Sequence, residues 1–457
     1  MTLFSWNAAR VSEALGLPVA NWEHTYSGLS TDTRTMSDGN LFVALKGERF
    51  DGHAFLGDAR LAGVGGVVVQ HGTPRWPGFD WFEVDDTLGA LGRLARYRRE
   101  RFGGPVVAIT GTNGKTGTKE LAAAALSPKF RVHKSVRNLN NLVGVPLTIL
   151  AAPLEAEAMV VECGASVPGE IVRLREIVRP DVAVVTNVDA GHLEGFGSRE
   201  AVLTEKVALL EGAPTADVGD RPPALAELAR ATARRVITAS ATGAADWKAE
   251  EVRLLEDGRP AFRVRGIAVE LPLRGRHMVD NALVALAVAD ALGVPLADAA
   301  GALSQVVLPG GRMEVFEAGG MTVVNDCYNA NPASVAAALD SVSLMRGKRR
   351  LVVVIGTMRE LGAESAALHR EAAERVLASK PDVVAAIGEF VPAFDALGAA
   401  AAAVKVRGAD PGAVTPGLRE LLRPGDVVLL KASRGVALEQ IVPALWPATT
   451  PPADEAH

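Results

Sequence analysis

The sequence has few cysteines, no long apolar run and no recognisable leader segment. Only Cys163 and Cys327 occur among its 457 residues, which argues against a disulfide scaffold and fits a reducing compartment. The longest stretch without a charged residue, 138–154, contains three Asn and two Pro, so we expect no transmembrane helix. The N-terminus shows no basic segment followed by an apolar one, so we expect no secretory signal.

Charge of one sign is not in excess either. The chain has 48 Lys+Arg and 53 Asp+Glu, a net charge of −5. Basic residues cluster at 96–101 and 346–350, which we interpret as the solvated face of a helix and as a charged turn before a strand. Nucleic acid is therefore not an expected partner. The 48% hydrophobic and 22% charged shares are ordinary for a globular protein, and the length predicts about three domains. These features predict a soluble, cytoplasmic, multidomain protein.

The order of strand-like and helix-like segments predicts an α/β protein. Up to about Val84 a short helix at 6–15 is mixed with strands at 41–45 and 66–69, which suits a small mixed domain. Alternating strands and helices then imply βαβ units and mainly parallel sheets, first after residue 105 and again after residue 311. The predicted strands are 106–110, 159–161, 182–186, 321–324, 351–355, 383–387 and 427–430, and the predicted helices are 119–126, 169–178, 333–344, 365–378 and 417–422. We expect the tail from Pro447 to be disordered.

The strongest local motif follows the strand at 106–110. It reads Gly111-Thr112-Asn113-Gly114-Lys115-Thr116, with a helix predicted to open at Gly117. Such a loop aims backbone N–H groups at phosphate oxygens, its lysine reaches the terminal phosphates, and its threonine hydroxyl can ligate Mg²⁺. The strict pattern has a glycine where this chain has Ile109. The motif predicts nucleotide binding.

Two more polar residues come after predicted strands. Glu162 follows the strand at 159–161, where open α/β sheets bind ligands, so it is a candidate metal ligand or water-positioning acid, or else a helix cap. His192 follows the strand at 182–186 and either binds a metal, orients a carboxylate or is simply hydrogen-bonded.

Further candidates have weaker support from the residues alone. Lys206 reads as a helix-surface lysine, and Asn281 opens a long alanine-rich helix as a cap or a ligand contact. Arg312 lies at the predicted domain junction, where an arginine can stabilise transferring phosphate charge. Cys163 and Cys327 adjoin these motifs without a local base, so we interpret them as buried filler.

Taken in order, these motifs resemble the Mur ligase family, and the resemblance covers nearly the whole chain. The segments 326–332, 356–362 with His369, and 430–435 are similar to the MurF type of that family, as are 30–34 and 45–53. Thr357, Ala432 and Met278 depart from the family pattern, which usually has Asp, Gly and Asn at these positions.

The resemblance implies three α/β domains. Residues 1–84 would hold the uridine nucleotide of the substrate, residues 85–311 would form a P-loop-type mononucleotide-binding domain for ATP, and residues 312–457 would form a Rossmann-like domain that closes over both. It implies a monomeric cytoplasmic ligase that uses ATP and Mg²⁺ to join D-alanyl-D-alanine to UDP-N-acetylmuramoyl-tripeptide through an acyl phosphate. Diaminopimelate and lysine are both compatible with the third position of the tripeptide.

The resemblance also implies roles for residues at matching positions. The catalytic set is Lys115, Glu162, His192, Lys206 and Arg312, with Thr116, Glu162 and His192 as metal ligands and Lys206 as a site of carbamylation. The implied ATP-binding residues are Gly111, Thr112, Asn113, Gly114, Lys115, Thr116, Gly117, Asn281, Arg312, Asp326 and Tyr328, and the implied substrate-binding residues are Ser30, Thr31, Arg34, Lys46, Asp51, Gly52, His53, Asn140 and Asn141.

Three alternatives share parts of this pattern. A non-catalytic nucleotide sensor could keep the fold, although such relatives usually lose some of the groups that are present here. A motor ATPase or a kinase would also use Gly-Lys-Thr, but a motor would hydrolyse ATP without an amine co-substrate. A sister ligase of the folylpolyglutamate or cyanophycin type would share the central domain but not the segments 30–34 and 46–53.

Overall fold

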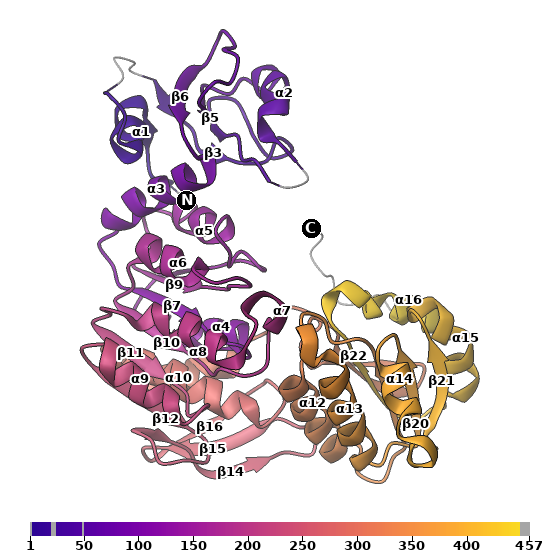
Figure 1. Cartoon of the computed structure of the whole chain (residues 1–457). Coiled ribbons are helices and arrows are strands. Elements are labelled where there is room, and N and C mark those ends of the chain that lie inside the picture. Colours follow the sequence, from indigo (N-terminus) through magenta and orange to yellow (C-terminus); the bar gives the residue numbers. More distant parts are fainter. Residues whose placement is uncertain (1, 20–23, 48–49, 448–457) are drawn as a thin grey trace.

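The computed structural model describes residues 2–19, 24–47 and 50–447, which form three units (Figure 1). The N-terminal unit holds elements β1 to β6, the central unit α3 to η3, and the C-terminal unit β17 to α16. Each contains a largely parallel sheet with helices, so the expected α/β fold with three domains is confirmed. The exact boundaries after residues 84 and 311 stay predictions, and the predicted disordered tail lies outside the described residues beyond Pro447. No helix within the described ranges is long and apolar enough to span a bilayer.

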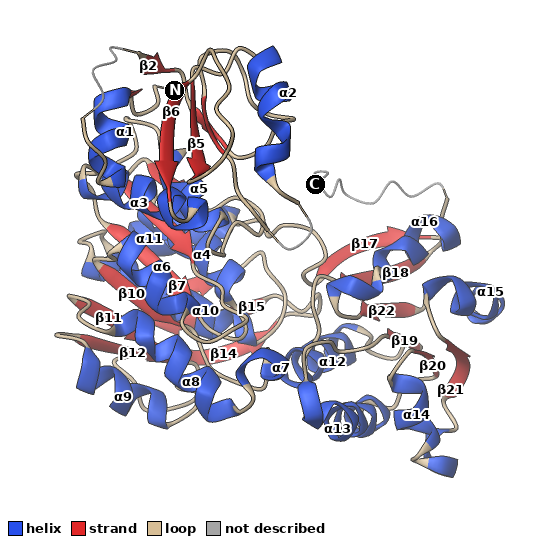
Figure 2. Ribbon diagram, turned by 45° about the horizontal axis from the view of Figure 1, so that its top comes forward, coloured by secondary structure: helices blue, strands red, loops and turns tan. Residues whose placement is uncertain are grey.

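The N-terminal unit is a four-stranded parallel sheet, β3-β4-β5-β6, flanked by α1 and α2 (Figure 2). The helix predicted from Trp6 begins at Ala8, because Trp6 and Asn7 pair with a second short strand and the Asn7 side chain caps the helix. The elements are β1 (Trp6–Asn7), α1 (Ala8–Leu15), β2 (Thr25–Tyr26), β3 (Leu29–Ser30), β4 (Leu41–Val43), η1 (Gly52–Phe55), α2 (Leu56–Leu61), β5 (Gly66–Gln70) and β6 (Asp80–Val84).

Helix α3 (Thr87–Glu100) joins this unit to the central one. Its N-terminus is capped by the Asp86 side chain, and the Tyr97 hydroxyl donates a 2.6 Å hydrogen bond to Glu13 of α1. The interpretation of the basic cluster at 96–101 as a solvated helix face is wrong for Arg98, which is 2% exposed and stacks over the ring of Phe4. The cluster at 346–350 is a turn before a strand, as predicted.

Seven parallel strands form the central sheet in the order β13-β12-β11-β10-β7-β9-β8. The strands predicted at 106–110, 159–161 and 182–186 lie side by side as β7, β9 and β10, and their residues are buried on both faces, which explains their continuous apolar runs. The chain leaves β7 toward one edge and later returns to its other side, so the carboxyl end of β7 is a topological switch point. The strands are β7 (Val106–Thr110), β8 (Val132–Lys134), β9 (Ala158–Glu162), β10 (Val182–Val185), β11 (Thr215–Val218), β12 (Val236–Ser240) and β13 (Trp247–Lys248).

Helices cover both faces of the central sheet. Val107 and Ile109 of β7 pack with α4, α10 and α11, whereas Val106 and Ala108 pack with α3, α5 and α6 on the opposite face, as the two-residue period of a strand requires. The helices are α4 (Lys115–Leu126), α5 (Gly144–Leu150), α6 (Glu170–Val178), α7 (Leu193–Phe196), α8 (Arg199–Val207), η2 (Ala208–Leu210), α9 (Ala224–Thr232), α10 (His277–Ala291), α11 (Leu296–Ala302) and η3 (Leu303–Gln305).

A small antiparallel sheet in the central unit was not predicted. It consists of β14 (Glu250–Leu254), β15 (Pro260–Val264) and β16 (Ile267–Glu270) in that order. The residues of β14 are all exposed or partly exposed and include three charged side chains, so this strand lacks the apolar run that marks the buried strands.

The C-terminal unit has a six-stranded sheet in the order β17-β18-β22-β19-β20-β21, in which only β17 is antiparallel to its neighbour. The strands predicted from 321, 351, 383 and 427 are present, whereas β17 and β21 were not predicted. The elements are β17 (Glu314–Ala318), β18 (Met321–Asp326), α12 (Pro332–Met345), β19 (Leu351–Ile355), η4 (Gly362–Glu364), α13 (Ser365–Ala378), β20 (Val383–Ile387), α14 (Phe390–Asp395), η5 (Gly398–Ala401), β21 (Val404–Gly408), α15 (Pro411–Leu421), β22 (Val427–Lys431), η6 (Arg434–Val436), η7 (Leu438–Gln440) and α16 (Ile441–Leu445).

Candidate active site

A glycine-rich turn links β7 to α4 at the switch point of the central sheet. Gly111 has φ 141° and Gly114 has φ 79°, both in the region that favours glycine. A Cβ on Gly111 would lie 2.1 Å from the Thr186 hydroxyl, and one on Gly114 would lie 2.5 Å from the Asn281 amide oxygen. Helix α4 begins at Lys115 rather than at the predicted Gly117, so its N-terminal N–H groups open directly toward the turn.

Lys115 folds back over the turn that carries it. Its ammonium group donates hydrogen bonds to the carbonyl oxygens of Gly111 at 2.8 Å and Thr112 at 3.1 Å. Burial lowers the pKa of Lys115, and the nearby charge of Glu162 partly opposes that shift. The lysine is thus held by neutral carbonyls, and an anion at the turn would be a stronger partner.

Glu162 ends β9 beside the first turn of α4. Its carboxylate accepts hydrogen bonds from the Thr116 hydroxyl at 3.0 Å and from the Asn140 amide at 2.9 Å, and its backbone N–H donates to Ser135 at 3.0 Å. Glu162 is only 3% exposed, and these contacts fix its orientation. The neighbouring Asn141 instead caps α5 by accepting from the N–H groups of residues 143 and 144.

The Thr116–Glu162 pair fits Mg²⁺. A hydroxyl and a carboxylate oxygen that already lie 3.0 Å apart are hard oxygen donors, which is the set that this ion prefers. Across the described part of the chain, no three or more His, Cys, Asp and Glu side chains gather around one point. This is compatible with Mg²⁺, which is usually held by one or two carboxylates together with phosphate oxygens and water.

His192 lies between the central and C-terminal units. It adopts a left-handed backbone, φ 57°, just before α7, and its Nδ1 atom lies 2.5 Å from the Glu360 carboxylate. Its imidazole nitrogen is a less usual Mg²⁺ ligand than oxygen. In this structure the His192 ring lies against the Glu360 carboxylate.

Lys206 is buried, so the prediction that it is a helix-surface lysine is wrong. Its ammonium group donates to the carbonyl of Ala165 at 3.2 Å and lies 5.6 Å from the centre of the Phe196 ring. Burial, with a further contribution from the charge of Lys115, lowers the pKa of Lys206 to about 7. A large fraction of this amine is therefore neutral and nucleophilic near neutral pH.

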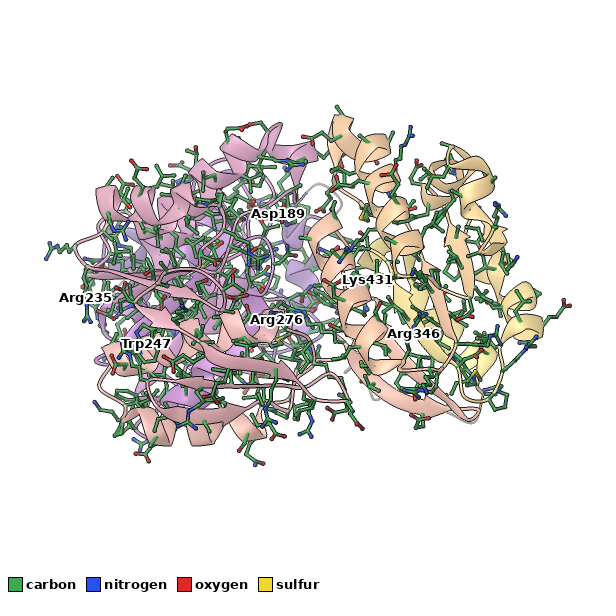
Figure 3. All side chains as sticks on the ribbon, turned by 90° about the horizontal axis from the view of Figure 1, so that it is seen from below. Asp189, Arg235, Trp247, Arg276, Arg346 and Lys431 are labelled. Atoms are coloured by element: carbon green, nitrogen blue, oxygen red, sulfur yellow. The ribbon has the colours of Figure 1, made fainter. Side chains whose placement is uncertain are left out.

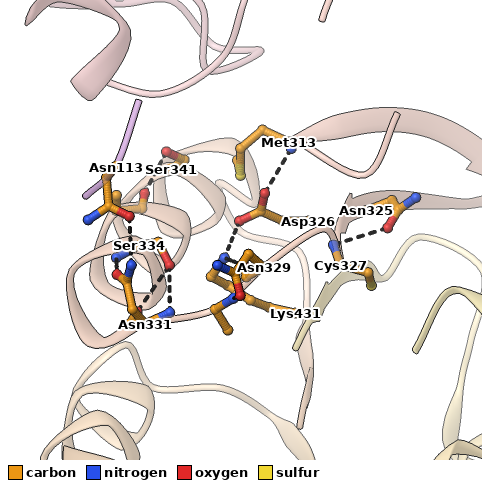
Figure 4. A network of polar contacts seen from close by, with 12 residues as sticks. Asn113, Met313, Asn325, Asp326, Cys327, Asn329, Asn331, Ser334, Ser341 and Lys431 are labelled. Atoms are coloured by element: carbon orange, nitrogen blue, oxygen red, sulfur yellow. Dashed lines mark hydrogen bonds and ion pairs between the residues drawn. The ribbon is translucent and has the colours of Figure 1, made fainter. Parts of the chain in front are cut away.

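Asp326 ends β18 on the C-terminal side of the site, next to Lys431 at the end of β22 (Figure 4). Lys431 is 1% exposed and donates to the Asp326 carboxylate at 2.6 Å and to the Asn329 carbonyl at 2.9 Å. Sequence analysis missed Lys431, although a lysine that follows a run of buried apolar residues was a usable signal.

Arg312 precedes β17 and stacks on Tyr328. Its guanidinium carbon lies 3.5 Å from the centre of the Tyr328 ring, and one of its nitrogens contacts the Pro309 carbonyl at 3.4 Å. The next residue, Met313, donates its N–H to Asp326 at 3.1 Å. Arg312 is thus held by a ring and a carbonyl, without a carboxylate among these contacts.

The two units are also connected by an amide–amide hydrogen bond. Asn331, which caps α12, donates to the side-chain oxygen of Asn113 in the glycine-rich turn at 2.7 Å (Figure 4). This bond ties the C-terminal unit directly to the turn. Sequence analysis gave no role to Asn331 or Glu360, because their partners are distant in the chain.

These residues line a cleft of about 500 Å³ between the central and C-terminal units. In the view from below, Asp189 and Lys431 mark its two sides (Figure 3). Gly111, Lys206, Asn331 and Glu360 do not line the cleft, although each contacts a residue that does. The predicted residues that line it are Thr112, Asn113, Gly114, Lys115, Thr116, Gly117, Asn140, Asn141, Glu162, His192, Asn281, Arg312, Asp326 and Tyr328.

Asn281 and the two cysteines are buried. The Asn281 amide nitrogen lies 3.6 Å from the sulfur of Met278, the residue that replaces the usual asparagine. Cys163 and Cys327 are buried free thiols whose pKa values are raised by burial, as expected of filler rather than of nucleophiles.

The residues predicted to bind a uridine nucleotide lie apart from the cleft, in the N-terminal unit. Arg34 forms a two-pronged hydrogen bond with Asp32, and Asp51 contacts the ring of His53 at 2.6 Å. His53 in turn accepts from the backbone N–H of Gln70 at 2.9 Å. The set lies in two chain segments, one at the end of β3 and the other between β4 and the start of η1, at the predicted positions Ser30, Thr31, Arg34, Lys46, Asp51, Gly52 and His53.

Three protein-family models match consecutive parts of the chain. The Mur ligase family catalytic domain matches residues 25–99, the Mur ligase middle domain matches residues 109–289, and the Mur ligase glutamate ligase domain matches residues 311–434.

Whole proteins are similar as well. The UDP-N-acetylmuramoyl-tripeptide–D-alanyl-D-alanine ligase of Bacillus subtilis is 36% identical over 426 residues, which covers 91% of this chain and 92% of that protein. The ligase of the same name from Escherichia coli is 35% identical and covers 97% of this chain and 99% of that protein.

Solved structures show the same similarity. A crystal structure of MurF from Acinetobacter baumannii superposes with a TM-score of 0.88 at 30% identity, over 97% of this chain and 99% of that one. The MurF ligase of Thermotoga maritima in complex with ADP gives a TM-score of 0.80 at 29% identity, over 92% of this chain and 96% of that one.

Proposed function

The chain belongs to the Mur ligase family, and from that premise we propose that it joins D-alanyl-D-alanine to UDP-N-acetylmuramoyl-tripeptide. The protein is an ATP-dependent ligase that forms an amide bond in peptidoglycan synthesis. The observation that carries the assignment is the cleft in which a phosphate-binding turn faces charged groups of a second unit, Asp326 and Lys431. We place the enzyme in the cytoplasm as a monomer.

The proposed reaction has two steps. A terminal carboxylate oxygen of the tripeptide attacks the γ-phosphorus of ATP, and ADP leaves with the electrons of the broken P–O bond. The amine of the dipeptide then attacks the acyl carbon, the bond from that carbon to the phosphate oxygen breaks, and the nitrogen loses a proton as the amide forms. Both steps develop negative charge on phosphate oxygens, so the site must concentrate positive charge.

The proposed phosphate-binding groups come from both units. Lys115 would exchange the carbonyls of its own turn for the β- and γ-phosphate oxygens, and the N–H groups at the start of α4 would add partial positive charge. Arg312 would bind phosphate charge from the other side of the cleft. The remaining proposed ATP contacts are Gly111, Thr112, Asn113, Gly114, Thr116 and Gly117 of the turn and its helix, Asn281 at the adenine, and Asp326 and Tyr328 at the ribose.

Mg²⁺, when bound, would neutralise phosphate charge. We propose Thr116 as a ligand of one ion, and Glu162 with His192 as ligands of a second. The Thr116 hydroxyl and the Glu162 carboxylate lie 3.0 Å apart, close enough to contact the same ion, whereas His192 would first have to separate from Glu360.

Lys206 is the proposed site of carbamylation. Its amine would attack CO₂ through its lone pair and lose a proton, which gives a carbamate with the charge of a carboxylate. The lowered pKa of Lys206 supports this proposal, because only the neutral amine can react.

The UDP-substrate would extend from the N-terminal unit to the cleft. We propose that Ser30, Thr31, Arg34, Lys46, Asp51, Gly52 and His53 bind its nucleotide end, and that Asn140 and Asn141 bind near its reacting carboxylate.

Phosphate release from the purified protein tests this function. With Mg²⁺ and ATP present, release should require both UDP-N-acetylmuramoyl-tripeptide and D-alanyl-D-alanine, and the nucleotide product should gain the mass of the dipeptide less water. Phosphate release with ATP alone would indicate a hydrolase. Absence of phosphate release when ATP and both substrates are present would contradict the assignment.

A further inference from the structure

A carboxylate of the C-terminal unit lies where the site otherwise concentrates positive charge. The side chain of Glu360 contacts the Nδ1 atom of His192 at 2.5 Å. Glu360 thus brings a carboxylate up to His192, a residue that lines the cleft together with the phosphate-binding turn.

The backbone around Glu360 is held in place from several sides. Glu360 adopts a left-handed conformation, φ 64°, and its carbonyl accepts from the N–H of Glu194 at 3.1 Å. The residue before it, Arg359, donates its N–H to Ser433 at 2.9 Å, and the one before that donates to His369 at 2.9 Å. A non-glycine residue in this conformation is costly, and such positions cluster where a side chain must be aimed at a ligand.

A carboxylate in this place does not suit the phosphates of ATP. Phosphate oxygens and Glu360 repel one another, so Glu360 would weaken nucleotide binding unless a cation accompanied it. An ion pair between partly exposed groups such as Glu360 and His192 contributes little to stability, so stability alone is a weak reason for it. Besides a metal ion, the cation that the reaction brings to this place is the ammonium group of the amino substrate.

The position of Glu360 also suits delivery of the amine. The acyl phosphate would be held by the central unit at Lys115, whereas Glu360 approaches from the C-terminal unit. Beside it, Arg359 presents an exposed guanidinium group whose terminal nitrogen donates to the Gly435 carbonyl at 2.8 Å. Adjacent residues of opposite charge match a zwitterion such as a free dipeptide.

We infer that Glu360 binds the ammonium group of the incoming amino substrate and that His192 occupies this position in the substrate-free enzyme. The inference rests on the proposed function, since it needs an amine as the second substrate. Arrival of the ammonium group would release His192 from Glu360, which connects binding of the amine to the orientation of His192.

Glu360→Gln tests the inference, with Glu364→Gln as the matched control. Glu364 also pairs across the boundary of the two units, with Arg199 at 3.4 Å, but Arg199 does not line the cleft, whereas His192, the partner of Glu360, does. In Glu360→Gln we expect the KM for D-alanyl-D-alanine to rise about 10- to 100-fold, the range for loss of one charged hydrogen bond, while the KM for ATP changes less than twofold. Glu364→Gln should leave both constants within twofold of the wild type.

A binding measurement separates recognition from folding effects. Calorimetry with the wild-type enzyme and ADP should detect D-alanyl-D-alanine but not N-acetyl-D-alanyl-D-alanine, which lacks the ammonium group, and Glu360→Gln should abolish this preference. Glu360→Asp, which keeps the charge, should bind the free dipeptide more tightly than Glu360→Gln does.

An unchanged KM for the dipeptide in Glu360→Gln, or an equal rise for ATP, would overturn the inference while the ligase function stands. A wild-type enzyme that does not use the dipeptide would instead overturn the proposed function itself.

Discussion

The hydroxyl of Thr116 at the start of α4 donates a 3.0 Å hydrogen bond to the carboxylate of Glu162 at the end of β9. Glu162 ends β9, and Thr116 lies in the helix that follows the adjacent strand β7, in which Ile109 pairs with Glu162. Two oxygen donors are thereby placed together beside the phosphate-binding turn before any ligand is present. This preorganisation is what transition-state stabilisation requires of a charged site.

Replacing Glu162 removes the carboxylate from this pair. We expect Glu162→Gln to lower turnover by at least about 100-fold, the usual loss for one preorganised electrostatic group, with an unchanged melting temperature. Glu162→Ala should have the same effect on turnover. Thr116→Val should also be impaired, whereas Thr116→Ser, which keeps the hydroxyl, should retain most activity. Near-normal turnover of Glu162→Gln in a steady-state assay of ADP release would remove this residue from the mechanism.

Lys115 is the second target. Its lowered pKa means that the folded protein disfavours the charged form, so the charge lowers stability at neutral pH. We therefore expect Lys115→Met to fold with a melting temperature no lower than that of the wild type, but to lose the stabilisation that ATP provides in thermal denaturation. A variant that melts normally and still shows the full ATP-dependent shift would contradict the proposed contact with phosphate.

Asp217 offers a test of stability away from the cleft. It is fully buried in β11, and neither of its carboxylate oxygens has a hydrogen-bond partner among the described residues. Burial raises the pKa of Asp217 well above its usual range. In the unfolded chain this carboxyl ionises above pH about 4, so its contribution to stability falls as the pH rises from there toward the folded-state pKa.

We therefore expect Asp217→Asn to be more stable than the wild type at neutral pH, by about 1–3 kcal/mol, with a smaller gain near pH 4. Chemical denaturation at several pH values measures this dependence. The control is Asp85→Asn, since the Asp85 side chain is fully exposed and should show no such trend. A gain that does not depend on pH would contradict the assigned cause.

The pKa of Lys206, about 7, predicts pH-dependent carbamylation. The neutral amine becomes dominant as the pH rises through 7, so a carbamate formed with ¹³C-labelled bicarbonate should give a ¹³C NMR signal that is stronger at pH 8 than at pH 6. Lys206→Arg should lose the signal. Persistence of the signal in that variant would show that another amine carries it.

The sequence predicted the parts of the site that are local in the chain. Residues 111–116 specify their own turn, because Gly111 and Gly114 supply backbone conformations that other residues rarely adopt, and the buried runs of β7, β9 and β10 place Glu162 beside it. Strands β14, β15 and β16 were not predicted because they are short and because β14 is rich in charged residues. Polar sequences of that kind carry no strong periodic signal.

Tertiary structure alone decided which groups of the C-terminal unit meet the turn. Lys431 reaches Asp326 across 105 residues of chain, and Asn331 reaches Asn113 across 218. The place of Glu360 beside the site likewise follows only from its contact with His192 in the folded protein. The strands and helices of each unit follow local sequence patterns, whereas the contacts between units depend on how the units pack together. The sequence by itself thus determined the phosphate-binding chemistry, and the packing of the units determined the second side of the cleft.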